Sequence, residues 1–290
     1  MRMFSEHNPF AVTACIFGAA GVAMFSMDPV ILCLSLAGAL TLTLMRPDGR
    51  RLRPHLWMLL LFAAMALVNP LFNHRGDTVL LVMNHRPVTL EALLYGLAAG
   101  GMVLGVMYWF RSYTAIMTSD RLLYLFGALS PRLALVLSMA LRYVPLFSQQ
   151  ARRIQRAQQS LGLYRDDNVV ASFRGGLSVF SGLTTWALEN GVVTADSMAA
   201  RGYGTGKRTR FSPLHFTRHD AALLIVSLLL TALALWGIAG HSVAYYPTFT
   251  AAPMDLQTWA GYGAYALLVF LPAIIDGKEA LRWRCLQSRI

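Results

Sequence analysis

The sequence contains few charged residues. Only 13% of its 290 residues are Asp, Glu, Lys or Arg, while 56% are hydrophobic, and the mean hydropathy is +0.50. A typical soluble domain carries about 25% charged residues. This scarcity therefore excludes an ordinary soluble domain and indicates a membrane protein.

Cysteine is also scarce. Cys15 and Cys33 fall in apolar runs and Cys285 in the C-terminal tail, with no Cys-x-x-Cys spacing and no paired histidines beside them. Disulfide frameworks and structural zinc sites need such spacings. The sequence therefore supports neither of them.

The sequence contains long runs of apolar residues. Each is close to the roughly 20 residues that a helix needs to cross hydrocarbon. We therefore expect an all-α polytopic membrane protein with about six transmembrane helices. No small-residue cleavage pattern follows the first run, so we expect a retained helix and not a signal peptide. The runs cover residues 10–27, 29–45, 56–72, 90–110, 221–238 and 259–275.

The placement of basic residues predicts the orientation. The formal net charge is +11, which could suggest nucleic-acid binding. With the N-terminus inside, however, only Arg75 and Arg86 fall in outward loops, leaving 23 of the 25 Lys and Arg on the inner side. By the positive-inside rule we expect a multi-pass protein of the cell membrane with both termini in the cytoplasm. The basic character then reflects topology, and we expect no nucleic-acid partner.

Three regions are predicted along the chain. Residues 1–110 form an N-terminal transmembrane region of about four helices. Residues 111–220 form a coupling-helix region on the cytoplasmic side, which holds most of the arginines. Residues 221–290 form a C-terminal transmembrane region of about two helices and a cytoplasmic tail.

Two long helices are predicted in the middle region. The first starts near Pro131, runs as one helix or as two joined near Pro145, and ends at Gly162. The second starts near Val170 and ends at Gly202. Small residues recur along it at every fourth position and would let another helix cross at close range, although ordinary bundle packing is the simpler alternative. This small-residue stripe consists of Ala187, Gly191, Ala195 and Ala199.

The candidate metal ligands are weak. Residues 73–89 read as a short outward hairpin with turn-forming residues at each end. It carries His74 and His85, and we expect these to make turn contacts and not to bind metal. His215 and His219, four residues apart, receive the same interpretation. We therefore predict no metal, cofactor or catalytic residues.

The loop MAARGYGTGKRTR only superficially resembles a phosphate-binding loop. A Walker A loop requires Gly, four residues, and then Gly-Lys-Ser/Thr. Here Arg201 stands five residues before Gly206, and Arg208 follows Lys207. The motif fails at both ends, so no nucleotide site is predicted.

Two other classes of protein have little support. A self-contained secondary transporter or channel needs polar groups or broken helices at the bilayer midplane. The six runs contain almost none, since Glu91 and Asp276 lie at their ends. A membrane-embedded enzyme needs a cluster of catalytic residues. The pair Glu189 and Asp196 is a weak candidate for such a cluster.

Four segments carry a family resemblance: NPLFNHRG, TLEALLYG, DRLLYLFGALSPRLALVLSMALRYVP and TADSMAARGYG. Through them the chain resembles the transmembrane T component of energy-coupling factor (ECF) transporters. The resemblance implies a non-catalytic scaffold without a cofactor of its own. Such a scaffold joins two cytoplasmic ABC-type ATPase subunits to a membrane S component, which captures a vitamin or a metal ion. The alternative is a self-contained secondary transporter or channel.

The resemblance also implies docking residues. Two coupling helices would cross in an X, and each would end in an arginine-centred motif that binds one ATPase. By match to that motif, the docking residues are Ala200, Arg201 and Gly202 on the second helix, and Ser160, Leu161 and Gly162 on the first. Leu161 stands where the pattern has arginine. Either Arg156 or Arg165 supplies the charge there, or the contact is apolar.

Overall fold

The computed structural model describes residues 4–46, 52–73, 76–83, 86–162, 169–206, 216–241, 243–251, 253 and 255–287. The chain forms two compact units. Met1–Leu122 and Leu214–Ile290 make up the first, the transmembrane unit, and Leu123–Pro213 make up the second, the helix-pair unit.

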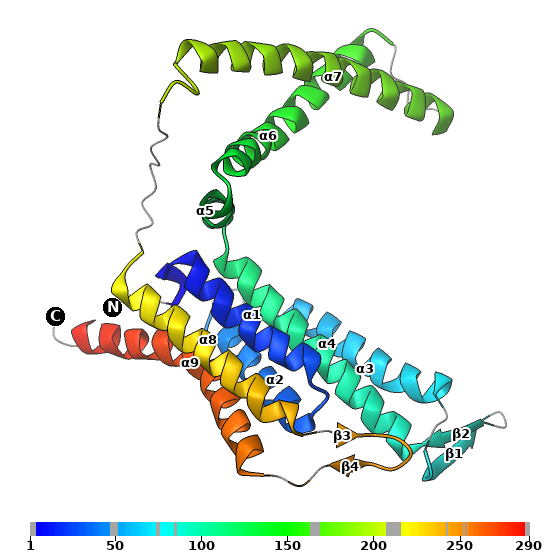
Figure 1. Cartoon of the computed structure of the whole chain (residues 1–290). Helices are drawn as coiled ribbons and strands as arrows, with labels where there is room; N and C mark the ends of the chain where they lie inside the picture. The colour runs from blue at the N-terminus through cyan, green and yellow to red at the C-terminus, as the bar shows by residue number, and fades with distance from the viewer. Residues whose placement is uncertain are drawn as a thin grey trace. The chain divides into compact units, whose positions relative to one another are not determined.

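The transmembrane unit is built from helices, and each of the six apolar runs forms one of them (Figure 1). They are α1 (Pro9–Phe25), α2 (Pro29–Leu44), α3 (Leu52–Phe72), α4 (Leu90–Ile116), α8 (Arg218–Ala239) and α9 (Leu256–Gln287), preceded by the short 3-10 helix η1 (Phe4–Glu6). Among the described residues, α3, α4, α8 and α9 are long and apolar enough to cross a membrane. Helices α1 and α2 are apolar but shorter, at 17 and 16 residues. The predicted all-α membrane fold is confirmed.

Side chains with strong capping preference start these helices. Asn8 Oδ1 accepts from Phe10 N at 3.2 Å and begins α1. Asp28 Oδ1 accepts from Val30 N at 3.0 Å and begins α2. Each cap is followed by proline at the first helical position, where a missing N–H costs nothing. The local sequence therefore sets both starts.

The core of the transmembrane unit is assembled from several helices. Trp109 and Tyr265 are the largest fully buried side chains. Trp109 Nε1 donates to Ser35 Oγ at 3.0 Å, and Tyr265 Oη donates to the Ala19 carbonyl at 2.9 Å. Buried polar tips need such partners, because an unpaired donor is costly in a low-dielectric interior. These bonds join α1, α2, α4 and α9.

Short strands lie between the helices. Segment 73–89 contains an antiparallel pair, which confirms the predicted hairpin. A second antiparallel pair connects α8 to α9. His74 and His85 lie outside the described residues. The strands are β1 (Val79–Met83) with β2 (Arg86–Thr89), and β3 (Val243–Ala244) with β4 (Thr250–Ala251).

Three connections meet at one end of the transmembrane unit. Tyr245 Oη donates to the Met27 carbonyl at 2.6 Å, and Asn73 Nδ2 donates to Tyr246 Oη at 2.9 Å. Burial, with Asp28 nearby, raises the pKa of Tyr245 to about 12. These bonds bring the α1–α2, α3–α4 and α8–α9 connections together. The three predicted outward loops therefore share one side.

The other helix ends meet on the opposite side. Phe4 N donates to Asp276 Oδ1 at 2.7 Å, and Arg46 Nη1 donates to the Ser112 carbonyl at 2.9 Å. These bonds bring together the N-terminus, the ends of α2 and α4, and the polar part of α9. We call this side the basic end, after Arg46, Arg53, Arg111, Arg218, Lys278 and Arg282.

The helix-pair unit holds two long helices, α6 (Pro131–Ser160) and α7 (Val169–Ala200). The short helix α5 (Ser119–Leu129) precedes them. Of the two alternatives for the first long segment, the structure has one continuous helix that passes through Pro145.

Candidate partner-docking helix ends

Helices α6 and α7 cross and contact each other (Figure 1). Tyr143 Oη and Thr194 Oγ1 are 2.9 Å apart, and Gln158 Nε2 donates to Ser178 Oγ at 2.9 Å. Positions late in α6 therefore meet positions early in α7, so the two helices run in opposite directions. Their C-terminal ends lie on opposite sides of the crossing.

The C-terminus of α7 is closed by a glycine turn. Gly202 N donates to the Ala199 carbonyl and Tyr203 N to the Met198 carbonyl, both at 3.0 Å. This pair of bonds is the Schellman pattern, with Arg201 as the C-cap. Gly202 has a φ of +76°, a conformation that glycine adopts without steric cost. The chain turns sharply there and leaves Arg201 exposed.

The C-terminus of α6 also ends at a glycine of positive φ. Gly162 has a φ of +70°, and its N–H donates to the Gln159 carbonyl at 3.0 Å. Leu161 is the C-cap residue, and its side chain is 73% exposed. The predicted triplets Ser160-Leu161-Gly162 and Ala200-Arg201-Gly202 therefore occupy equivalent positions in the two helices.

The charges around these ends are open to solvent. Arg201 has no ion pair with Asp196 or Glu189 within the part of the chain that the structure describes. Arg156, one alternative source of charge for the first end, is exposed. Arg165, the other alternative, lies outside the described residues.

The small-residue stripe on α7 lies outside the contact with α6. Ala187 is half-buried, but Gly191, Ala195 and Ala199 are exposed. A Cβ added at Gly191 would meet nothing within 4 Å, whereas one at Gly182 would lie 3.6 Å from Ile154. The contact with α6 therefore uses a neighbouring face of α7. As a crossing face for some other helix, the stripe stays a prediction.

The sequence interpretation missed the side chains that make this contact. Phe147 packs edge-on against Trp186, with ring centroids 5.8 Å apart. Together with Tyr143, Ile154 and Gln158, Phe147 recurs along α6 at spacings of four and seven residues, which place side chains on one helical face. This spacing in the sequence could have identified the face of α6 that contacts α7.

Much of the apolar surface that the structure describes on α6 and α7 is exposed. No described residue of α6 is buried, and in α7 only Gly175 is. Val136, Phe173 and Val192 are 63%, 69% and 62% exposed. Large exposed apolar surfaces mark contacts with another protein or with a membrane.

Within the described residues, no group of three or more His, Cys, Asp and Glu side chains could hold a metal ion. His219 is described and exposed, whereas His215 lies outside the described residues. Glu189 and Asp196, the weak enzyme candidate, are both exposed on α7.

These features define a class: a polytopic α-helical membrane protein that carries a pair of long crossing helices with glycine-closed ends. The family model described as "Cobalt transport protein" (CbiQ) matches residues 3–213. The chain therefore belongs to this family, which comprises the T components of ECF transporters.

Several curated relatives are ECF transporter transmembrane proteins, EcfT. The chain is 33% identical to EcfT 1 of Listeria monocytogenes over 34% of its own length and 38% of that protein. It is 30% identical to EcfT of Lactobacillus helveticus over 36% and 38% of the two chains. The match to EcfT of Listeria innocua has 28% identity over 64% and 73%. The chain thus spans well under half the length of the first two relatives.

Proposed function

We propose that this protein is the membrane-embedded coupling subunit of an ATP-driven ECF-type importer for a micronutrient, either a vitamin or a metal ion. It binds two cytoplasmic ABC-type ATPase subunits and a membrane S component, and it performs no catalysis itself. The observation that carries the proposal is the pair of equivalent, exposed, glycine-closed ends on two crossing helices.

The end of α7 has the chemistry of a docking site. Arg201 sits at the negative end of the helix macrodipole, which favours a cation there. Its guanidinium presents five donors in a planar fork, suited to carboxylates or carbonyls on a partner. The arginine has no ion pair among the described residues, so the fork is available to an ATPase groove.

The end of α6 offers an apolar contact instead. Leu161 is 73% exposed at the position equivalent to that of Arg201. Burying a leucine side chain fully is worth about 1.5–3 kcal/mol. That is comparable to a hydrogen bond with a charged group, about 1.5–3 kcal/mol. Both ends can therefore hold an ATPase, by different forces.

The crossing would let the two ends act together. Tyr143 and Thr194, and Phe147 and Trp186, join α6 and α7 between the ends. A displacement of one ATPase would tilt its helix and, through these contacts, the other helix. The exposed apolar faces of both helices would meet the S component or lipid. Residues 111–220 would form the coupling region between the two transmembrane regions.

The proposed orientation places the basic end of the transmembrane unit in the cytoplasm, with both termini. It rests on the excess of Lys and Arg in the predicted inward segments. In the sequence, the three connections that meet at the opposite end contain two Lys or Arg residues, Arg75 and Arg86.

A self-contained transporter has less support. Among the described residues, the buried carboxylates Asp28, Glu91 and Asp220 lie at the N-cap or in the first turn of their helices, and Glu279 follows the apolar part of α9. Intramembrane transport sites place ionisable groups near the midplane. Here Asp28 caps α2 and Asp220 completes the capping box of α8, while Glu91 accepts bonds from Thr78.

Co-purification tests the proposal. The full-length protein, tagged and expressed with its neighbouring genes, should retain two ATPase chains and a small membrane protein in mild detergent. Purification of the chain alone, with substrate uptake that persists when the ATPases are deleted, would instead support the self-contained transporter.

A further inference from the structure

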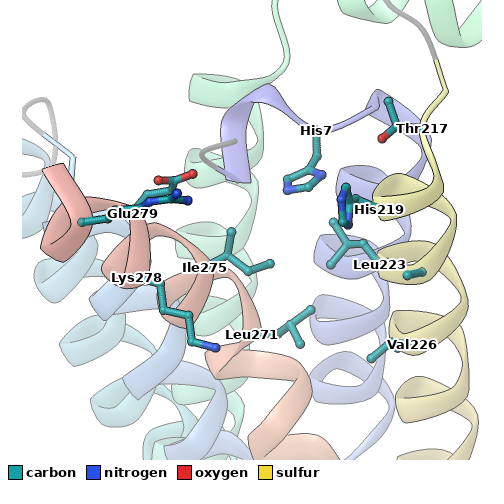
Figure 2. Close-up of a pocket in the computed structure, with 11 residues that line it drawn as sticks. His7, Thr217, His219, Leu223, Val226, Leu271, Ile275, Lys278 and Glu279 are labelled. Atoms are coloured by element: carbon teal, nitrogen blue, oxygen red, sulfur yellow. The ribbon is translucent and has the colours of Figure 1, made fainter. Parts of the chain in front are cut away.

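A cavity lies at the basic end between α8 and α9. Its volume is about 620 Å³. Figure 2 shows Thr217 and His219 on one side and Lys278 and Glu279 on the other, with Leu271 and Ile275 between them. Nothing in the proposed coupling function uses this cavity.

One wall of the cavity is apolar. Leu223 and Val226 come from α8, and Leu271 and Ile275 come from α9. Leu223 is buried in the transmembrane unit, whereas the side chain of Val226 is 41% exposed at the surface of the unit. The apolar wall therefore reaches the part of the surface that faces hydrocarbon in a membrane.

The polar edge of the cavity is basic. Lys278 and Arg282 are four residues apart, so they project from the same face of α9. Both are exposed, and His219 stands opposite them at the start of α8. The cavity also has one carboxylate, Glu279, but its side chain is withdrawn from the surface, with the residue only 6% exposed. The edge therefore presents an excess of cations.

The remaining histidine of the cavity is held in place. His7 Nδ1 lies 2.8 Å from Asp220 Oδ1, which also accepts a bond from Asn8 N at 3.0 Å. Asp220 Oδ2 accepts from Thr217 N and Thr217 Oγ1, at 3.0 and 2.7 Å. These bonds anchor the N-terminal segment against the start of α8. Hydrogen bonds therefore fix the side of the cavity that His7 and Thr217 form.

The polar and apolar parts of the cavity are ordered along α8 and α9. Lys278 and Arg282 follow the apolar part of α9, which ends at Ile275, and His219 precedes the apolar part of α8. The basic edge thus lies at the membrane boundary, and the apolar wall lies deeper. Pro272 interrupts the hydrogen bonding of α9, and Figure 1 shows its last part running in a new direction. That part carries Trp283, 58% exposed, a residue type enriched at membrane interfaces.

We propose that this cavity binds an anionic phospholipid. Its phosphate contacts Lys278, Arg282 and His219, and one acyl chain lies along Leu223, Val226, Leu271 and Ile275. Basic pockets between transmembrane helices are suited to anionic headgroups. A soluble phosphate compound would use the basic edge but not the apolar wall that opens toward hydrocarbon. This feature favours a lipid as the occupant.

Native mass spectrometry of the full-length protein tests the proposal. The protein is reconstituted in nanodiscs with equal amounts of phosphatidylglycerol and phosphatidylcholine, and the lipids retained after release are identified. We expect preferential retention of phosphatidylglycerol. The double variant Lys278→Gln/Arg282→Gln should weaken it about thirtyfold, as about 1 kcal/mol for each basic residue near the membrane implies.

Two matched comparisons separate a site from general surface charge. The double variant Arg53→Gln/Arg218→Gln also removes two positive charges at the basic end, but from residues outside the cavity. It should retain as much phosphatidylglycerol as the unmodified protein. Val226→Trp places a larger side chain in the apolar part of the cavity without changing the charge, and it should displace the lipid. Leu229→Trp, at a residue 64% exposed and outside the cavity, should not. Gel filtration should show a monodisperse peak for each variant, as expected for a folded protein.

Four results would overturn the proposal. Equal loss of lipid in the two charge variants would mean surface attraction only. Equal retention of phosphatidylcholine would remove the anionic requirement. Displacement of phosphatidylglycerol by millimolar inorganic phosphate would identify a soluble anion as the occupant. A photo-cross-linker at position 226 that captures a partner polypeptide, and not a photoreactive phosphatidylglycerol, would identify a protein helix.

Discussion

Leu161 and Arg201 hold the same position in the two long helices. Each is the residue before a glycine of positive φ, +70° at Gly162 and +76° at Gly202. In both turns the glycine N–H donates, at 3.0 Å, to the carbonyl three residues earlier. The backbone at the two ends is therefore alike, while one side chain is apolar and the other is a cation. If both ends bind ATPases as we propose, the two contacts should differ in kind.

Arg201→Ala should leave the protein folded in the membrane but weaken ATPase binding. Losing a charge-assisted hydrogen bond costs about 1.5–3 kcal/mol, and stranding a buried partner charge costs about 3–5 kcal/mol. Arg201→Glu should be worse, because it adds repulsion. Pull-down of the ATPases measures both variants. Arg174→Ala, an exposed arginine early in α7, is the control, and ATPase recovery that stays unchanged in both Arg201 variants would refute the assignment.

Leu161→Asp should disrupt assembly at every salt concentration. Burial of an apolar side chain is not screened by salt, whereas exposed charges are screened with a Debye length of about 8 Å at physiological ionic strength. Leu161→Arg should be tolerated only if the facing ATPase groove is acidic. Val169→Asp, at a residue 88% exposed at the start of α7, is the control.

Cross-linking separates Leu161 from its two alternatives. Single cysteines at 156, 161 and 165 are cross-linked to the ATPases in the assembled complex. Position 161 should give the strongest product. Strong products from 156 or 165, with none from 161, would move the contact to an arginine.

The orientation predicts a labelling pattern. In intact cells, Asp77→Cys should react with a membrane-impermeant maleimide, and Glu6→Cys should react only after permeabilisation. Both positions are exposed. Gly76 is unsuitable because its φ is +144° and an added Cβ would lie 2.4 Å from Glu91 Oε2. The exposed native thiols Cys33 and Cys285 are first replaced by serine. The reverse pattern would place the basic end outside.

Gly237→Ala should destabilise the transmembrane unit. An added Cβ would lie 2.4 Å from the Gly261 Cα, a backbone atom that cannot move without shifting α9. Overpacking of this kind costs about 1–3 kcal/mol. Thermal unfolding in detergent should show a lower midpoint. Gly263→Ala is the control on α9, because a Cβ there meets nothing within 4 Å. A midpoint that is equal in both variants would contradict the tight α8–α9 contact.

The sequence by itself determined the helices and their ends. Backbone groups in hydrocarbon must be satisfied within their own segment, so long apolar runs are enough to predict membrane helices. Asn8 and Asp28 begin α1 and α2 through bonds to residues two positions away. Gly162 and Gly202 end α6 and α7 because only glycine takes a positive φ freely. All of these are short-range effects.

Only the tertiary structure decided which faces meet. Trp186 and Thr194 of α7 contact α6, whereas the small-residue stripe stays a prediction as the crossing face for another helix. Many spacings along a helix can support packing, and the choice depends on the shape of the partner surface. The cavity likewise joins His7, His219 and Lys278 from distant parts of the chain. No local pattern links such residues, because their proximity arises from packing among helices that each form independently.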